Sequence, residues 1–131
     1  MYLESVSRVS ELENEALRAR AMGAPNGHIT HWYRFVNQTS EYAFVILDIW
    51  PDDDAVILYE LVVSPPLRRT GVGTTVLAAV EALTKKMGRC RVRLRPHPLD
   101  DSISPSALVR WYMKNGYRAE EGDSDMYYKD L

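Results

Sequence analysis

The stretch that decides the fold is LVVSPPLRRTGVGTT, residues Leu61 to Thr75, in which an apolar run gives way to a short basic loop and then to a helical pattern. Gly71 and Gly73 allow backbone amides to approach a ligand closely, or else they only form a tight turn. The first amides of a helix have no partner inside it and lie at the positive end of its dipole, so they favour an anion. Arg68 and Arg69 add positive charge beside them. The stretch therefore predicts a phosphate-binding loop.

Two common phosphate-binding motifs do not fit this loop. It lacks the Gly-Lys-Ser/Thr of a P-loop, and Val76 stands where a dinucleotide-binding fingerprint has its third glycine. The loop must therefore be compared with other phosphate-binding patterns.

A third motif does fit. RRTGVG, Arg68 to Gly73, matches the Gln/Arg-x-x-Gly-x-Gly/Ala pattern of the GNAT superfamily of N-acetyltransferases, and LVVSP, Leu61 to Pro65, resembles the Leu-x-Val-x-Pro that precedes it there. The resemblance implies that the loop binds acetyl-CoA and that the preceding strand pairs its backbone with the pantetheine arm, as an added strand would. The residues implied to bind the cofactor are Leu61, Val62, Val63, Arg68, Arg69, Thr70, Gly71, Val72, Gly73 and Thr74.

Length and composition limit the alternatives. A chain of 131 residues forms one domain, residues 1–131, that can bury a core without disulfides or metals. Its 16 Lys and Arg against 18 Asp and Glu give a net charge of −2, which disfavours a general nucleic-acid or membrane-surface role. Cys90 is the only cysteine, the start shows no basic and apolar leader, and no apolar run reaches membrane-spanning length. We expect a cytoplasmic, soluble protein.

Apolar patterning predicts four strands and one helix in the first half of the chain. The expected strands are 2–6, 28–36, 42–50 and 55–63, with turns at 26–27, 37–40 and 51–54. Trp32 and Phe35 are candidate core residues, and the third strand is apolar enough to be covered on both faces. Ser10 and Glu13 form a capping box that opens a helix through Met22, before Gly23 and Pro25.

The second half is predicted to alternate helices and strands. The expected elements are a helix over 71–87, a strand over 89–95, a helix over 105–115 and a hairpin of 117–119 with 125–129. Ser104 is a helix N-cap followed by Pro105 at the first helical position. The expected buried side of the first helix consists of Val72, Val76, Ala79, Val80 and Leu83.

This order of elements resembles the GNAT fold from about Gly27 to the end of the chain. The resemblance implies an α/β (α+β) domain with a mixed central sheet of about six to seven strands and about three helices. Only a few residues separate Gly23 from the next strand, so the family's second helix is expected to be missing. Because that helix helps to wall the acceptor site, the site is left open or is completed by the second subunit of a homodimer.

A second resemblance lies in the last helix. WYMKNGY, Trp111 to Tyr117, resembles the family's Leu/Phe-Tyr-x-Lys-x-Gly-Phe signature, whose tyrosine often protonates the departing thiolate of coenzyme A. Tyr112 is thereby implied as the general acid, the alternative being a core residue in an apolar stripe. Pro105 and Leu108 replace the Asn-x-x-Ala that often precedes the tyrosine, so the cofactor contact of that asparagine is absent.

Glu60 is the first candidate for the general base. It interrupts an apolar strand that leads to the cofactor loop, where it would act through water; otherwise it is an exposed strand residue or the partner of an arginine. His97 is a second candidate base, although its flanking prolines favour an ordinary loop residue. His28 and His31 lack partners at metal-ligand spacing, so no metal is expected.

Charge patterning adds two features. Strict alternation over 89–95 places Cys90, Val92 and Leu94 on one face and four arginines on the other, which predicts a solvated basic face or a contact with a subunit or an acidic partner.

The second feature is an acidic turn, which contains Glu120, Glu121, Asp123 and Asp125. Lys129 and Arg118 are the only cations near it in sequence. In the resembled fold this turn borders the acceptor, so its negative field favours a cationic amine. The alternative is that the acidic residues only keep the hairpin soluble.

The expected function is direct transfer of an acetyl group from acetyl-CoA to a primary amine on a small molecule or a peptide. Two alternatives remain: a non-catalytic sensor that binds acyl-CoA, and a small α/β interaction module whose arginine face binds an acidic protein.

Overall fold

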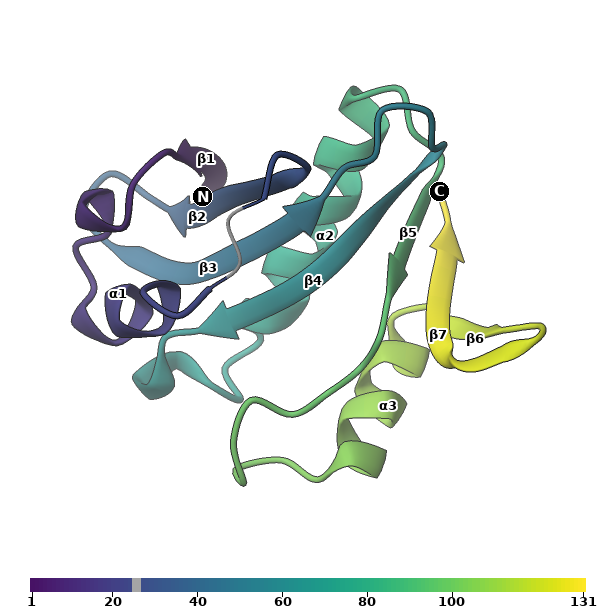
Figure 1. Cartoon of the computed structure of the whole chain (residues 1–131). Helices are drawn as coiled ribbons and strands as arrows, with labels where there is room; N and C mark the ends of the chain where they lie inside the picture. Colours follow the sequence, from purple (N-terminus) through teal and green to yellow (C-terminus); the bar gives the residue numbers. More distant parts are fainter. Residues whose placement is uncertain (25–26) are drawn as a thin grey trace.

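The computed structural model describes residues 1–24 and 27–131, and its centre is a seven-stranded mixed sheet (Figure 1). The strands are β1 (Tyr2–Val6), β2 (Thr30–Val36), β3 (Glu41–Asp48), β4 (Ala55–Val63), β5 (Arg91–Leu94), β6 (Arg118–Glu120) and β7 (Asp123–Asp130). Their order is β1-β2-β3-β4-β5-β7-β6, and β4 and β5 run parallel whereas the other neighbours are antiparallel. The predicted mixed sheet is confirmed.

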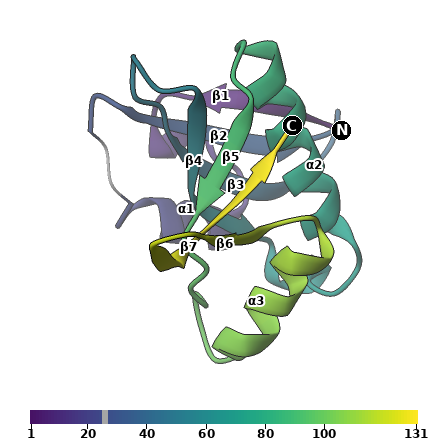
Figure 2. The ribbon, with the colours of Figure 1, turned by 90° about the vertical axis from the view of Figure 1, so that its right-hand side faces the viewer.

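Three α-helices flank the sheet: α1 (Glu15–Ala21), α2 (Val72–Lys86) and α3 (Pro105–Lys114). Two short 3-10 helices, η1 (Val9–Glu11) and η2 (Pro65–Leu67), precede α1 and α2. The helices α1 and α2 cover opposite faces of the sheet (Figure 2). Within the described residues, no helix is both long and apolar enough to cross a bilayer.

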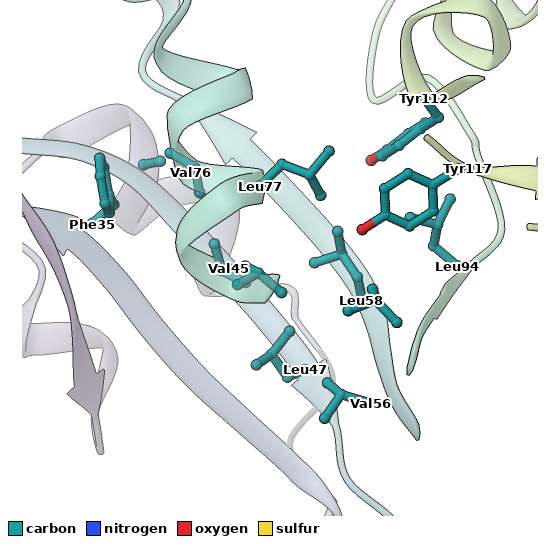
Figure 3. Packing of buried hydrophobic residues seen from close by; sticks show 13 residues of the cluster. Phe35, Val45, Leu47, Val56, Leu58, Val76, Leu77, Leu94, Tyr112 and Tyr117 are labelled. Carbon is teal, nitrogen blue, oxygen red and sulfur yellow. The ribbon is translucent and has the colours of Figure 1, made fainter. Parts of the chain in front are cut away.

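Two apolar cores explain why β3 is almost continuously apolar. Ala43, Val45 and Leu47 face α2, whereas Phe44 and Ile46 face α1. The core under α2 contains Phe35, Val56, Leu58, Val76, Leu77, Val80, Leu94, Tyr112 and Tyr117 (Figure 3). The core under α1 contains Val6, Leu12, Leu17, Ala21, Trp32 and Val62. Ala43 to Leu47 are thus all buried on one side or the other, as expected for a strand covered on both faces.

The predicted start of the first helix is wrong. The helix begins at Glu15 rather than after Ser10, and Asn14 caps it by accepting the amides of Ala16 and Leu17. The Ser10 and Glu13 box does not form because Glu41 of β3 accepts the amides of Glu13 and Asn14 at 2.7 and 2.6 Å, while Leu12 is buried in the core under α1. A tertiary contact therefore overrides the local capping signal.

Several other boundaries move by one or two residues. The strand expected over 89–95 is limited to Arg91–Leu94, and Cys90, expected to share the face of Val92 and Leu94, is exposed. The predicted strand 28–36 starts at Thr30. The α2 and α3 helices and the closing hairpin are confirmed, with Ser104 capping α3 through the amide of Ala107. The helix stop at Pro25 and the turn at Asn26 lie outside the described residues.

The arginine face of β5 is neither simply solvated nor free for a partner. Arg91 pairs with Asp130 at 2.7 Å, Arg93 with Glu120 at 2.6 Å and Arg95 with Asp123 at 2.9 Å. Arg93 and Arg95 thus lie near the acidic turn in addition to Lys129 and Arg118. They pair with two of its four carboxylates, Glu120 and Asp123. These two pairs weaken the negative field predicted for the turn, and sequence distance hid them because the arginines belong to a neighbouring strand.

Glu41 is expected to be a main source of stability. Glu41→Ala should lower the free energy of unfolding by about 3–5 kcal/mol, since it removes the buried carboxylate that pairs with Arg34 and accepts two backbone amides. The Glu41 side chain is 4% exposed, whereas Glu4, which pairs with the same arginine, is 41% exposed. Glu4→Ala should therefore cost less than about 1 kcal/mol. Urea denaturation of both variants measures the difference, and equal losses would contradict it.

Candidate active site

The candidate site lies where β4 and β5 separate. The two strands pair from Ala55–Arg91 to Leu58–Leu94, after which β5 ends and β4 continues to Val63. Figure 1 shows the strands side by side at their beginnings and apart at their carboxyl ends. Pro96 and Pro98 follow β5 and have no N–H to donate to a ladder. Within the described residues, β4 from Tyr59 to Val63 therefore has a strand on only one edge.

A bulge in β4, just past the last residue that pairs with β5, changes the face of the sheet on which the following side chains lie. Ile46 of β3 pairs with Glu60, and Leu47 pairs with Leu58, so Tyr59 is the additional residue. Before the bulge Leu58 faces the core under α2, and after it Leu61 and Val63 do. Glu60 is thereby placed on the α1 face of the sheet, beside Val62.

The separation contains a cavity of about 280 Å³. Its walls come from the free part of β4, the loop before α2, the segment after β5 and α3. The lining includes Glu60, Leu61, Val63, Arg68, Arg69, Gly71, Gly73, Thr74, His97, Asp100, Ser102, Trp111 and Tyr112. The structure thus brings most of the predicted site residues together around one concave space, the usual form of a small-molecule site.

The start of α2 opens into this cavity. Gly71 is the N-cap with φ of 89°, a left-handed conformation that favours glycine. Among the described residues no side chain caps the helix, and its first turn carries no acidic residue. Because the first hydrogen bond runs from the amide of Thr75 to Gly71, the amides of Val72, Gly73 and Thr74 have no acceptor inside the helix. This arrangement suits an anion.

Gly73 has a packing role as well. A β-carbon on it would lie 3.3 Å from the Trp111 ring and 3.8 Å from a Val63 methyl group. The absence of a side chain therefore lets α3 approach the first turn of α2.

The two loop arginines reach across the separation. Arg68 Nη1 lies 2.7 Å from Asp100 Oδ2, and Arg69 Nη2 donates to the Ser102 carbonyl at 3.1 Å. Hydrogen bonds from Ser102, with the Arg68 guanidinium, lower the pKa of Asp100 to about 2. Sequence reasoning missed Asp100 and Ser102, since no motif marks the segment that follows β5.

Tyr112 lies on the α2 side of the cavity. It is 8% exposed, and its ring packs edge to face against Trp111 and Tyr117. Burial raises the pKa of its phenol, which keeps the hydroxyl protonated. Among the described residues the hydroxyl has no hydrogen-bond partner, whereas Tyr117 donates to Glu81 at 2.8 Å. The Tyr112 hydroxyl is thus available as a donor to a ligand.

Glu60 is paired with an arginine. Arg20 of α1 donates from Nη2 to Oε1 at 2.5 Å and from Nε to Oε2 at 3.2 Å, and the Glu60 side chain is only 7% exposed. This is one of the alternatives that the sequence left open. Arg20 itself was missed, because forty residues separate it from Glu60.

Two remaining predictions concern His97 as a second candidate base and the absence of a metal site. His97 is exposed on the rim, with its ring Nδ1 3.0 Å from the Arg95 carbonyl. Within residues 1–24 and 27–131 no group of three His, Cys, Asp or Glu side chains is arranged to hold a metal ion.

The cavity connects the two faces of the sheet. Tyr112 belongs to the core under α2, and Glu60 is held from the α1 face, yet both line the same space. A ligand lying between β4 and β5 would therefore meet a hydroxyl donor on one face and a carboxylate on the other.

Comparison with known proteins identifies the family. The sequence matches the Acetyltransferase (GNAT) family over residues 9–117. The chain belongs to the GNAT family. Among curated proteins, no sequence matches that of this GNAT domain.

Solved structures share its fold. The PaiA N-acetyltransferase from Thermoplasma acidophilum, in complex with coenzyme A, matches with a TM-score of 0.61 and 21% identity, over 88% of this chain and 68% of that one. The ribosomal-protein-S18-alanine N-acetyltransferase from Escherichia coli matches with a TM-score of 0.69 and 16% identity, over 98% of this chain and 92% of that one. A GNAT family acetyltransferase from Elizabethkingia anophelis with acetyl-CoA bound matches with a TM-score of 0.66 and 11% identity, over 98% of this chain and 97% of that one. The resemblance drawn from the sequence is confirmed.

The two buried tyrosines of this GNAT domain should differ in their effect on stability. Tyr112→Phe should leave the free energy of unfolding unchanged within about 0.5 kcal/mol, because its hydroxyl gives up no hydrogen bond. Tyr117→Phe should lower it by about 1.5–3 kcal/mol, because the Glu81 carboxylate loses a donor. Thermal or urea unfolding of the pair is the measurement. A loss on Tyr112→Phe as large as that on Tyr117→Phe would show that the Tyr112 hydroxyl has a partner.

Proposed function

We propose that this GNAT domain is an N-acetyltransferase that moves an acetyl group from acetyl-CoA to a primary amine by direct attack. The observation that carries the proposal is the cavity between β4 and β5, with an uncapped helix start at one end and Tyr112 and Glu60 on opposite faces. The amine nitrogen forms a bond to the thioester carbon, the carbon–sulfur bond breaks, and the thiolate takes a proton as the nitrogen loses one.

The cofactor is proposed to lie along the free edge of β4. The amides of Val72, Gly73 and Thr74 would bind the pyrophosphate, with Arg68, Arg69 and Thr70 beside it. The backbone of Leu61, Val62 and Val63 would pair with the pantetheine arm. The support is the missing strand on this edge in the described residues.

Glu60 is proposed as the base that prepares the acceptor, directly or through water. An alkylamine with a pKa of about 10.4 is neutral in only about one molecule in a few thousand at pH 7, so the free amine must be generated. A positioned base typically contributes about a hundredfold to ten-thousandfold. A thiol of pKa about 8.5 is already a tolerable leaving group, so protonation by Tyr112 should matter less.

The acceptor side and the location are further parts of the proposal. The prediction of a cationic acceptor rested on the acidic turn, where Glu120 and Asp123 are paired with arginines, so we take the acceptor's charge from the groups beside Glu60 instead. A second subunit that completes the acceptor side of a homodimer stays a prediction, as does a cytoplasmic location, for which the support is the unpaired Cys90.

A non-catalytic sensor that binds acyl-CoA is the alternative that keeps the same cavity. The interaction module is less favoured, because the arginine face assigned to an acidic partner is paired internally.

Gly73→Asp should abolish acetyl-CoA binding, because it puts a carboxylate where the phosphates would lie. For the wild type, acetyl-CoA at a hundredfold excess over its Kd should raise the free energy of unfolding by about 2.7 kcal/mol, and the variant should lose this gain. Unfolding with and without acetyl-CoA, together with calorimetric titration, measures both effects.

Gly23→Asp is the matched control, since a β-carbon there has nothing within 4 Å. It should keep the gain. If Gly73→Asp cannot fold beside Trp111, Arg68→Gln with Arg69→Gln provides a second test and should weaken binding. Unchanged affinity in folded Gly73→Asp, or in the double variant, would refute the phosphate loop.

The second prediction separates the two proposed catalytic residues. Glu60→Gln should lower kcat/KM for the amine by at least about a hundredfold, the lower end of general-base catalysis. Tyr112→Phe should lower kcat by a smaller factor and leave the Kd of acetyl-CoA unchanged, because it removes only a hydroxyl.

Steady-state rates against an amine panel, with acetyl-CoA affinity measured by calorimetry, give both values. A Glu60→Gln enzyme as fast as the wild type would remove Glu60 from the mechanism, and turnover of no amine by a protein that binds acetyl-CoA would favour the sensor.

A further inference from the structure

Arg20 lies beside the cavity, bound to the lining residue Glu60, and three of its five N–H donors have no partner among the described residues. It donates to Glu60 from one edge of the guanidinium, Nε and Nη2. A guanidinium has five N–H donors in a plane. The second edge, formed by Nη1 and the other proton of Nη2, has no partner among the described residues, and the side chain is 43% exposed.

The same protein shows an arginine with both of its terminal nitrogens in use. Arg34 donates from Nη1 to Glu41 at 2.6 Å and from Nη2 to Glu4 at 2.7 Å, so one guanidinium binds two carboxylates. Arg20 has only Glu60. Asp100, whose charge also acts on Arg20, is paired with Arg68. The free edge of Arg20 therefore lacks a carboxylate.

We propose that Arg20 binds a carboxylate of the acceptor, and that the acceptor is an amine with a carboxylate close to it, the class that includes free amino acids. The inference rests on the proposed function and names its substrate class. The carboxylate would occupy the free edge of Arg20 in bidentate form, while the neighbouring amine lies against Glu60. Arg20 would then hold the base and the substrate in one plane.

The charges of the pair favour such a substrate. Glu60 attracts an ammonium group, but the exposed charge of Arg20 repels it unless the substrate also carries a negative group. A polyamine brings no such group, and the N-terminus of a peptide has its carboxylate at the far end. A zwitterionic amine matches both members of the pair, and a mismatch at a charged pair is a strong source of discrimination.

The test compares acids with their amides. The common amino acids and their α-carboxamides are assayed as acceptors at saturating acetyl-CoA with wild type, Arg20→Gln and the control Lys86→Gln, which removes an exposed charge from the end of α2. Because an amide lowers the pKa of its own ammonium group, the ratio of kcat/KM, acid over amide, is compared between variants.

Arg20→Gln should lower this ratio at least about tenfold, because it removes a charge-assisted hydrogen bond that only the acid makes. Lys86→Gln should leave it unchanged. If Arg20 only holds Glu60, Arg20→Gln slows the acid and the amide by the same factor, and the proposal is overturned. Acetylation confined to polyamines or peptide N-termini would overturn it as well.

Calorimetric binding of the same acids and amides to the wild-type complex with coenzyme A provides a readout without turnover. Acids that bind at least about tenfold more tightly than their amides support the role of Arg20 even if no amine is acetylated, in which case the proposed function alone fails. Equal binding of acid and amide overturns the role of Arg20.

Discussion

The separation of two parallel strands is the constraint on which the site depends. The strand β4 is held by β3 along almost its whole length, whereas its pairing with β5 is limited to Ala55–Leu58. The prolines after β5 cannot continue a ladder, and the bulge at Tyr59 turns β4 at the same level. The result is a free strand edge that lies beside the uncapped start of α2. Backbone donors and acceptors that a sheet would normally consume are therefore left for a ligand.

Buried carboxylates hold the short N-terminal region against this edge. Glu41 of β3 fixes the turn before α1 by accepting two backbone amides. Asn14 both caps α1 and donates to Ser64, the residue that follows β4, at 3.0 Å. The helix is thus attached at one end to the residue that follows β4 and near its other end to Glu60 through Arg20. The position of Arg20 beside Glu60 is a consequence of these polar contacts, because a helix of seven residues has little stability of its own.

Local sequence patterns were sufficient to predict the elements whose structure depends on residues close to one another in the chain. The strand Ala55–Val63, the helix after Gly71 and the Ser104 cap follow from apolar periodicity and capping chemistry, and they were predicted within a residue or two. The start of α1 was not, because Glu41 lies about thirty residues beyond the amides that it accepts. The same reason hid Arg20 and the partners of the β5 arginines. Side-chain pairs between distant segments leave no periodic signal, so the sequence indicated the glycine loop, Tyr112 and Glu60 but not Arg20.

The arrangement also bears on whether the acetyl group passes first to the protein. The only cysteine, Cys90, lies beside Asp54 where β4 and β5 begin, and the cavity opens at their other ends, about 13 Å away for four residues of strand. Ser64 is buried and engaged by Asn14, and the contact of His97 is to the Arg95 carbonyl, so neither belongs to an activated nucleophile pair within the described residues. These positions agree with the direct attack proposed above, in which the acceptor itself and not a protein nucleophile would attack the thioester.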